Sequence, residues 1–199
     1  QAEIYLSEGR RDNDKDKLLK AKEYAERILN IEGLSEKNKE RANELIASIE
    51  GALKDTDSKK LKSKAVDLLA AGKKDEALTI LNDCITRFGN TAEASDCFAI
   101  LFVSDEKVKD AESLRTFTEK YKSEELTKAA GDNNKKSQIY YTVGLIYEKG
   151  ADKFKQNSLL QTALENYRLG HDTSQRHFAF SIPSQLRKGI TTEKIEGKN

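Results

Sequence analysis

Acidic side chains near the start of the chain have the clearest spacing for chemistry. Asp12, Asp14, Asp16 and Glu23 are spaced like the oxygen ligands of a helix–loop–helix calcium site, with Leu19 at its apolar position. Such a loop turns sharply after its third acidic ligand and needs glycine there, whereas this chain has lysine at that position and further lysines on either side. We therefore interpret the segment as a polar linker in which Asp16 caps a following helix, with calcium-dependent regulation as the least favoured alternative.

Two cysteines and two histidines are the remaining candidates for nucleophilic or metal chemistry. Cys97 begins the longest apolar run, of seven residues, whereas a reactive thiol needs accessible, electropositive surroundings. We expect Cys97 and Cys84 to be buried, reduced residues that pack like small apolar side chains. His171 and His177 lie in the weakly periodic C-terminal part, and the sequence contains no metal, phosphate-loop or nucleophile motif. The sequence therefore predicts a non-enzymatic protein without metal or cofactor.

Composition predicts that helices position any binding surface of the chain. Ala, Glu, Lys, Leu and Arg make up about 48% of the 199 residues, which favours an all-α fold and argues against a β-sandwich or a doubly wound sheet. Basic and acidic side chains number 35 and 34, and no segment has the basic excess expected of a nucleic-acid partner. The seven-residue apolar run falls well short of the roughly 20 residues of a membrane-spanning helix.

The first residue of the chain indicates whether the chain has been processed. The chain begins with Gln1 and contains no methionine, and no signal peptide is visible in it. We interpret this as a processed or excised soluble chain, which is compatible with a leader removed during export. The cysteine count leaves the redox compartment open.

Helical periodicity divides the chain into four regions. We expect an N-terminal segment over 1–15, a helical hairpin over 16–54, repeated hairpins over 58–171 and a partly disordered extension over 172–199. Apolar residues recur along the first hairpin at three- and four-residue steps, as one helix face requires. They are Leu18, Ala21, Ala25, Ile28 and Leu29, then Ala42, Leu45, Ile46, Ile49 and Leu53.

Polar or aperiodic stretches predict where the helices stop. Residues 55–58 are predicted to break the helix that precedes them, and much of 123–136 is predicted to be loop because it contains glycine, aspartate and asparagine in succession. A short extended piece is expected over 177–182 ahead of Pro183, and the last ten residues are expected to fray.

Small residues recur at a fixed spacing within the predicted hairpins. Ala65 and Ala77 lie twelve residues apart, as do Ala99 and Ala111. Two helices approach closely only where both present small side chains, around which larger residues interdigitate. This spacing, with a hairpin of 34 residues over 58–91, resembles the tetratricopeptide repeat. The alternative is a helical bundle in which the alanine spacing arises by chance.

The fourth hairpin differs from the others in length. Gly144 and Ala163, its small-residue pair, lie nineteen residues apart. The stretch 143–150, followed by Ala163 and Tyr167, resembles the Sel1-like repeat, a relative of the tetratricopeptide repeat with longer loops. The resemblance implies an α-solenoid of about four antiparallel helix hairpins in a right-handed superhelix, with 58–171 as its repeats.

The resemblance also implies a binding face. Such arrays hold a partner peptide or helix on the concave face formed by the first helix of each hairpin. Ile100 and Val103 are predicted to point away from the core, with Phe98, Leu101 and Phe102 inside it, and the alternative is that the C-terminal segment or a neighbouring helix covers them. By position, the predicted partner-binding residues are Lys59, Lys62, Val66, Leu69, Asp96, Ile100, Val103, Tyr141, Leu145 and Glu148.

The function predicted on this basis is a protein–protein interaction scaffold. Its partner would be another protein or peptide, or a second copy of the chain. A carboxylate clamp for chaperone C-termini is rejected, since Lys62 matches such a clamp but Ser63, Val66 and Cys97 stand where asparagine is required. The alternative is a structural subunit or assembly factor of a larger complex, an extracytoplasmic one included. Ile100→Asp is expected to abolish partner capture and leave the helical circular dichroism unchanged.

Overall fold

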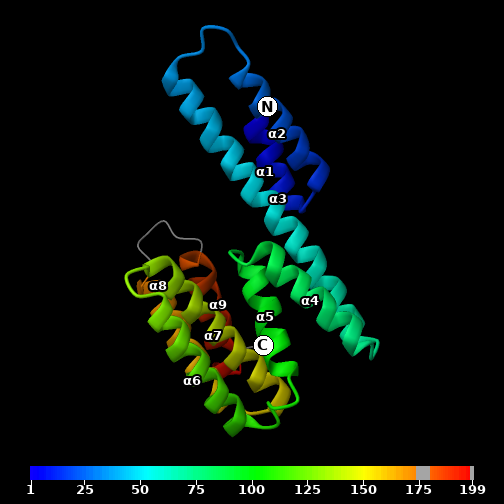
Figure 1. The fold of residues 1–199 in the computed structure, drawn as a ribbon, viewed down its shortest axis with the longest axis vertical. Coiled ribbons are helices and arrows are strands. Elements are labelled where there is room, and N and C mark those ends of the chain that lie inside the picture. The colour runs from blue at the N-terminus through cyan, green and yellow to red at the C-terminus, as the bar shows by residue number, and fades with distance from the viewer. Residues whose placement is uncertain (174–179, 198–199) are drawn as a thin grey trace. The chain divides into compact units, whose positions relative to one another are not determined.

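Residues 1–173 and 180–197 are described by a computed structural model, and these residues form nine α-helices and no strand. This confirms the predicted all-α class (Figure 1). The chain divides into two compact units, Gln1–Lys60 and Leu61–Asn199. The boundary between them falls inside a single helix, α3 (Glu36–Ala70), so each unit contains one part of that helix.

The first unit consists of α1 (Ala2–Asp12), α2 (Lys15–Leu29) and the beginning of α3. The segment 1–15 is thus largely helical. A Cβ atom added to Gly9 would lie 2.7 Å from Leu18 Cδ2, so glycine is what allows α1 and α2 to approach this closely. The core of this unit contains most of the predicted stripes of 16–54, including Leu18, Ala21, Ala25 and Ile49, but not Ile28, Leu29 or Ala42.

The junction between α1 and α2 corrects the predicted helix cap by two residues. Asn13 ends α1 in the left-handed region at φ 52°, and this leaves Asp14 in an extended conformation. The Asp14 carboxylate then accepts hydrogen bonds from the backbone N–H groups of Asp16 and Lys17, at 2.9 and 3.2 Å. Asp14, rather than Asp16, therefore caps α2.

The predicted break at 55–58 is wrong, because α3 continues through it. Its polar side chains have partners within the first unit. Asp57 forms an ion pair with Lys15, Nζ to Oδ1 2.9 Å, and the Thr56 hydroxyl donates to Asn13 Oδ1 at 3.2 Å. The Ser58 hydroxyl donates to a carbonyl of its own helix. Polar residues that are paired in this way need not end a helix.

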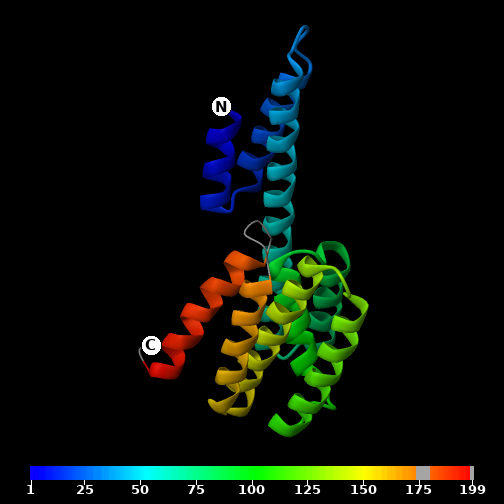
Figure 2. The same cartoon turned by 90° about the vertical axis from the view of Figure 1, so that its left-hand side faces the viewer.

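The second unit contains the end of α3 together with α4 (Lys74–Phe88), α5 (Ala92–Ser104), α6 (Ala111–Lys128), α7 (Asn133–Phe154), α8 (Ser158–Thr173) and α9 (Ser181–Glu196). Close neighbours are α4 and α5, α5 and α7, α6 and α7, α7 and α8, and α8 and α9. Figure 2 shows α9, in red, running beside α8, in orange. One core lies among α3, α4 and α5, and a larger one among α5 to α9.

The small residues predicted to permit close packing are buried in two of the three hairpins tested by the structure. Ala65 and Ala77 are fully buried, as is Ala163. A Cβ atom added to Gly144 would lie 2.5 Å from the ring of Tyr167, so α7 and α8 cross at this glycine.

The hairpin of α5 and α6 departs from this pattern. Ala99 is buried in the core that α5 shares with α7, and α5 lies close to α4 and α7 rather than along α6. Three aromatic rings fill the space on the α6 side, with Tyr121 of α6 5.0 Å from Phe98 and 6.1 Å from Phe102 between ring centroids. These rings keep the helices apart, so the expected close contact between Ala99 and Ala111 is replaced by aromatic packing.

Helix boundaries in the second unit also correct the sequence prediction. Helix α6 extends to Lys128 and α7 begins at Asn133, so little of 123–136 is loop. Asp132 makes this short turn sufficient, because its carboxylate accepts from the backbone N–H of Lys135 at 3.0 Å and caps α7.

The C-terminal part is more helical than predicted. Residues 177–179 of the expected extended piece lie outside the described residues, and the rest of it belongs to the start of α9. Pro183 is tolerated in the first turn of a helix, where its missing N–H has no intrahelical partner to lose. Helix α9 continues to Glu196 and ends at Gly197, whose φ of 68° makes it a left-handed cap. Among the described helices, none combines the length and apolarity that a bilayer crossing requires.

Candidate functional site

Three buried side chains on α5 and α7 form a polar surface inside the second unit, which we call the α5–α7 wall. They are Asp96 from α5 and Tyr141 and Glu148 from α7. All three belong to the predicted binding face. Tyr141 and Glu148 lie two turns apart on one face of α7, and the packing of α5 against α7 brings Asp96 to the same surface.

Asp96 is paired with cations from three other helices, the most distant being Arg187 of α9, with Nη2 3.9 Å from Oδ2. Lys62 Nζ, from the end of α3, lies 3.0 Å from Oδ2, and Lys149 Nζ, from α7, forms an ion pair with Oδ1 at 2.6 Å. Burial alone would raise the pKa of the Asp96 carboxyl, but the charges of Lys149 and Lys62 together outweigh burial and hold the pKa below its ordinary value. The carboxylate is therefore charged at neutral pH and oriented by both lysines.

Glu148 is 4% exposed and receives its cations from α9. Arg187 Nη1 lies 3.2 Å and Lys194 Nζ 3.1 Å from Oε1, while the hydroxyl of Tyr167 donates to Oε2 at 2.7 Å. Burial raises the pKa of Tyr167 well above its ordinary value, and the charge of Glu148 adds to this effect. Burial disfavours the Arg187 guanidinium, but the acidic groups around it, Glu148 first and Asp96 among them, together outweigh burial and raise the pKa of Arg187. The Tyr167 hydroxyl and the Arg187 guanidinium therefore keep their protons at neutral pH, and both continue to donate to the Glu148 carboxylate.

Helix α9 thus lies against the wall as an internal occupant. The ring centroid of Phe180, directly before α9, lies 5.5 Å from that of Tyr141. A Cβ atom added to Gly170 of α8 would lie 2.9 Å from the Ser184 hydroxyl oxygen, so α8 and α9 cross closely there. The hydroxyls of Ser184 and Thr191 are buried and have no hydrogen-bond partner within the described part of the chain. Ile195 of α9 packs against the larger core, but most side chains on the docking face of α9 are polar.

The predicted site residues are divided among several surroundings. Lys59 belongs to the first unit, Val66 is 46% exposed, and Lys62 and Leu69 are half-buried. Leu145 is buried in the larger core. Their role in binding a partner stays a prediction, and the structure gathers only the three wall residues and Lys62 into one contact network.

The expectation that Ile100 and Val103 point away from the core is wrong. Ile100 is buried in the core of α3, α4 and α5, and Val103 in the larger core. Phe98, Leu101 and Phe102, which were expected inside, are only partly buried. The reason is that α5 packs between α4 and α7, so residues on two sides of the helix become core. The C-terminal helix covers the polar residues of the wall.

The acidic side chains near the start of the chain, which are spaced like calcium ligands, interact with basic side chains and backbone N–H groups. Asp12 forms an ion pair with Lys17, Oδ2 to Nζ 2.6 Å, and its pKa is held below the ordinary value by hydrogen bonds from Arg11 and Lys17. Asp14 caps α2, and Glu23 pairs with Arg27. Among the described residues no three metal-ligating side chains converge on one point.

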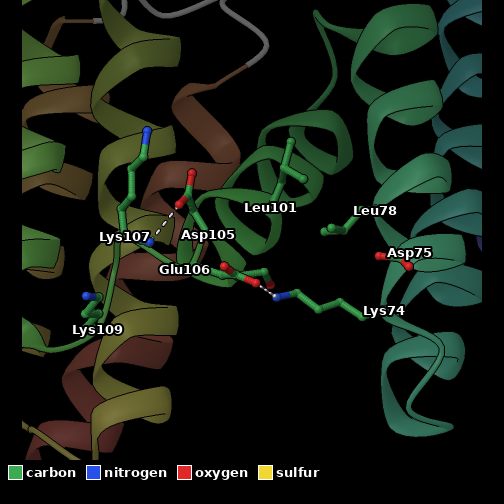
Figure 3. Close-up of a pocket in the computed structure, with 9 residues that line it drawn as sticks. Lys74, Asp75, Leu78, Leu101, Asp105, Glu106, Lys107 and Lys109 are labelled. Carbon is green, nitrogen blue, oxygen red and sulfur yellow. Dashed lines mark hydrogen bonds and ion pairs between the residues drawn. The ribbon is translucent and has the colours of Figure 1, made fainter.

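An open depression of about 750 Å³ lies at the end of the second unit where α4 approaches the turn after α5 (Figure 3). Leu78 and Leu101 face its interior, and Lys74 Nζ lies 3.7 Å from Glu106 Oε1 across it. Its described lining includes none of the ten predicted residues. The polar lining balances positive and negative charge, and consists of Lys74, Asp75, Ser104, Asp105, Glu106, Lys107 and Lys109.

Sequence reasoning missed the residues that α9 contributes. Phe180, Ser184, Arg187, Thr191 and Lys194 follow one another at steps of four and three, which places them on one helix face. A search for apolar periodicity does not detect this face because most of its members are polar. The spacing of Arg187 and Lys194, two helical turns, was the available signal.

The pairing of Asp96 predicts an acid-dependent loss of stability. Its pKa is lower in the folded than in the unfolded chain, so its contribution is present above the unfolded value of about 3.9 and is lost as the pH falls through the folded value. We expect the urea midpoint of the wild type, followed by circular dichroism, to fall below about pH 4 more steeply than that of Asp96→Asn. Equal slopes in the two proteins would contradict the pairing.

Comparison of the chain with protein-family models, with curated proteins and with solved structures finds no match.

Proposed function

We propose that the Leu61–Asn199 unit is a protein-binding module whose α5–α7 wall binds a helix carrying two basic residues seven positions apart. Helix α9 is the chain's own occupant of this site. In this proposal a partner helix, or α9 from a second copy, replaces α9 on the wall. The mechanism is charge and shape complementarity to a preformed surface, which loses little conformational entropy on binding.

The order of neighbouring helices supports the proposal that this unit is a tetratricopeptide-like array. Helix α5 packs against α7, which relates the first helices of two successive hairpins. Helix α4 packs against α5, and α6 against α7, so a second helix meets the first helix of the next hairpin. Stacked hairpin repeats make such nearest-neighbour contacts and expose one face formed by their first helices.

The observation that carries the proposal is the pairing of Glu148. Within the described residues its two cationic partners, Arg187 and Lys194, both come from α9. A buried carboxylate without a cation is strongly destabilising, because its desolvation is then uncompensated. The wall is therefore complementary to a basic helix, and a neutral or acidic helix would leave Glu148 unpaired.

The polar docking face of α9 supports exchange rather than permanent attachment. Two buried hydroxyls, those of Ser184 and Thr191, gain no hydrogen bond within the described chain, and each such group costs about 1–3 kcal/mol. Among the described side chains of this face, Phe180 is the large apolar one that is buried. A competing helix that satisfies these groups, or adds apolar contacts, would bind in preference to α9.

The test uses the full chain and a labelled peptide with the sequence of residues 180–197. In Arg187→Ala/Lys194→Ala the internal helix is weakened, and we expect this variant to bind the peptide at least about tenfold more tightly than the wild type, because a tethered helix competes at millimolar effective concentration. Fluorescence anisotropy measures both affinities. Lys188→Ala, at an exposed position of α9, is the matched control and should behave like the wild type.

A second peptide, with glutamate in place of both basic residues, distinguishes charge recognition from nonspecific binding. We expect no saturable binding of this peptide to the variant. Equal binding of both peptides, or binding of neither, would contradict the proposal. A stable oligomer by light scattering that α9 variants leave intact and that binds neither peptide would instead favour a structural subunit.

A further inference from the structure

The two cysteines of the chain face each other across the contact between α4 and α5. Cys84 lies in the last half of α4 and Cys97 in the first half of α5, and both are fully buried. Their sulfur atoms lie 2.9 Å apart. The thiols are thus much closer to each other than ordinary packing of two small apolar side chains requires.

The geometry of this contact favours bond formation. A disulfide has an S–S distance of about 2.05 Å, so the two sulfurs would need to approach by less than about 1 Å. Helices α4 and α5 are direct neighbours, and the surrounding residues Leu81, Phe88 and Ala94 belong to the same buried cluster. The packing therefore holds the two side chains toward each other, whether or not they are bonded.

The two thiols are electrostatically different. A hydrogen bond from Cys97 lowers the pKa of Cys84 although burial opposes this, whereas donation of that hydrogen bond and burial raise the pKa of Cys97. Such a pair provides one sulfur as the first nucleophile and the other as the resolving thiol.

We propose that Cys84 and Cys97 are a redox-modification site that closes to an intramolecular disulfide joining α4 to α5. The oxidant is a small-molecule disulfide such as oxidised glutathione. The Cys84 thiolate attacks one of its sulfurs, forming a mixed disulfide and releasing one thiolate. Cys97 then loses its proton and attacks the Cys84 sulfur, releasing the second thiolate. The protein loses two electrons and two protons, and the oxidant becomes two thiols.

The burial of the two cysteines determines how an oxidant gains access to them. With both cysteines fully buried, exchange requires local opening of the α4–α5 contact or takes place while the chain folds. The disulfide closes a loop of about 13 residues that links two successive hairpins, and a loop of this length constrains the unfolded chain. Oxidation is therefore expected to stabilise the core of α3, α4 and α5.

The experiment refolds the full chain in a buffer of reduced and oxidised glutathione, and separately in reductant. After oxidation we expect an intact mass lower by about 2 Da, from the two hydrogens lost. Tryptic peptides 75–87 and 88–107, each with one cysteine, should be recovered as one linked species. The melting temperature should rise by about 6–12 °C over the reduced form.

Cys84→Ala, Cys97→Ala and the double variant are the controls, and each should melt at the same temperature with and without oxidant. Three results would overturn the proposal: two titratable thiols remaining after oxidative refolding, a stable glutathione adduct on one cysteine without closure, or a linked protein that melts no higher than the reduced one. None of these results bears on the α5–α7 wall, whose peptide test uses other residues.

Discussion

Ile100→Asp is expected to lower the unfolding free energy of the Leu61–Asn199 unit by at least about 4 kcal/mol. Ile100 is 9% exposed and belongs to the core that α3, α4 and α5 share. The substitution removes a large apolar side chain and places a carboxylate in the buried apolar cluster that contains Leu81, Phe88 and Cys97. Urea denaturation followed by circular dichroism would show a large fall in the midpoint.

Val66→Asp is the matched control for this prediction. Val66 lies on the part of α3 within the same unit but is 46% exposed, so a carboxylate there remains hydrated. We expect its urea midpoint to match that of the wild type, within about 0.5 kcal/mol. If Ile100→Asp kept the wild-type midpoint, the burial of Ile100 would be wrong and the sequence-based expectation of an outward-facing residue would be restored.

Tyr167→Ala is expected to cost about 3–5 kcal/mol of unfolding free energy. The ring is fully buried, packs directly on Gly144 and lies 5.9 Å from the ring of Tyr141 between centroids. Its removal leaves a cavity where α7 and α8 cross, and takes away a hydrogen-bond donor to Glu148. Thermal or urea denaturation of the full chain measures the loss.

Tyr167→Phe separates the two contributions. It keeps the ring against Gly144 and removes only the hydroxyl that donates to Glu148 Oε2, for an expected loss of about 1–3 kcal/mol. Both variants should also weaken the attachment of α9, because Glu148 holds Arg187 and Lys194 through its other oxygen. Equal stability of the alanine and phenylalanine variants would show that the crossing of α7 and α8 does not depend on this ring.

The sequence was sufficient for features that depend on short-range patterns. The all-α class followed from composition, and the burial of Ala65, Ala77 and Ala163 followed from their spacing on helices. Features that depend on distant partners could not be derived in this way. The polar stretch 55–58 resembles a helix break when taken alone, and it continues as helix because Lys15 and Asn13 meet its side chains.

The candidate site shows the same limit. Asp96, Tyr141 and Glu148 were predicted to lie on one face, and the structure brings them together. Their surroundings were not predictable, since Arg187 and Lys194 come from a helix whose buried face is polar. The orientation of α5 was also mistaken, because an apolar run over 97–103 does not reveal which side each neighbouring helix will cover.

The uninterrupted course of α3 across residues 60 and 61 has a consequence for dissecting the molecule. Excising either half at that point would create new helix ends, each with four backbone groups deprived of their intrahelical partners. Deletion mutants that end at this junction would therefore lose stability because of the new helix ends, whatever the role of the deleted residues. Point substitutions in the uncut chain are the sounder way to assign roles to its two units.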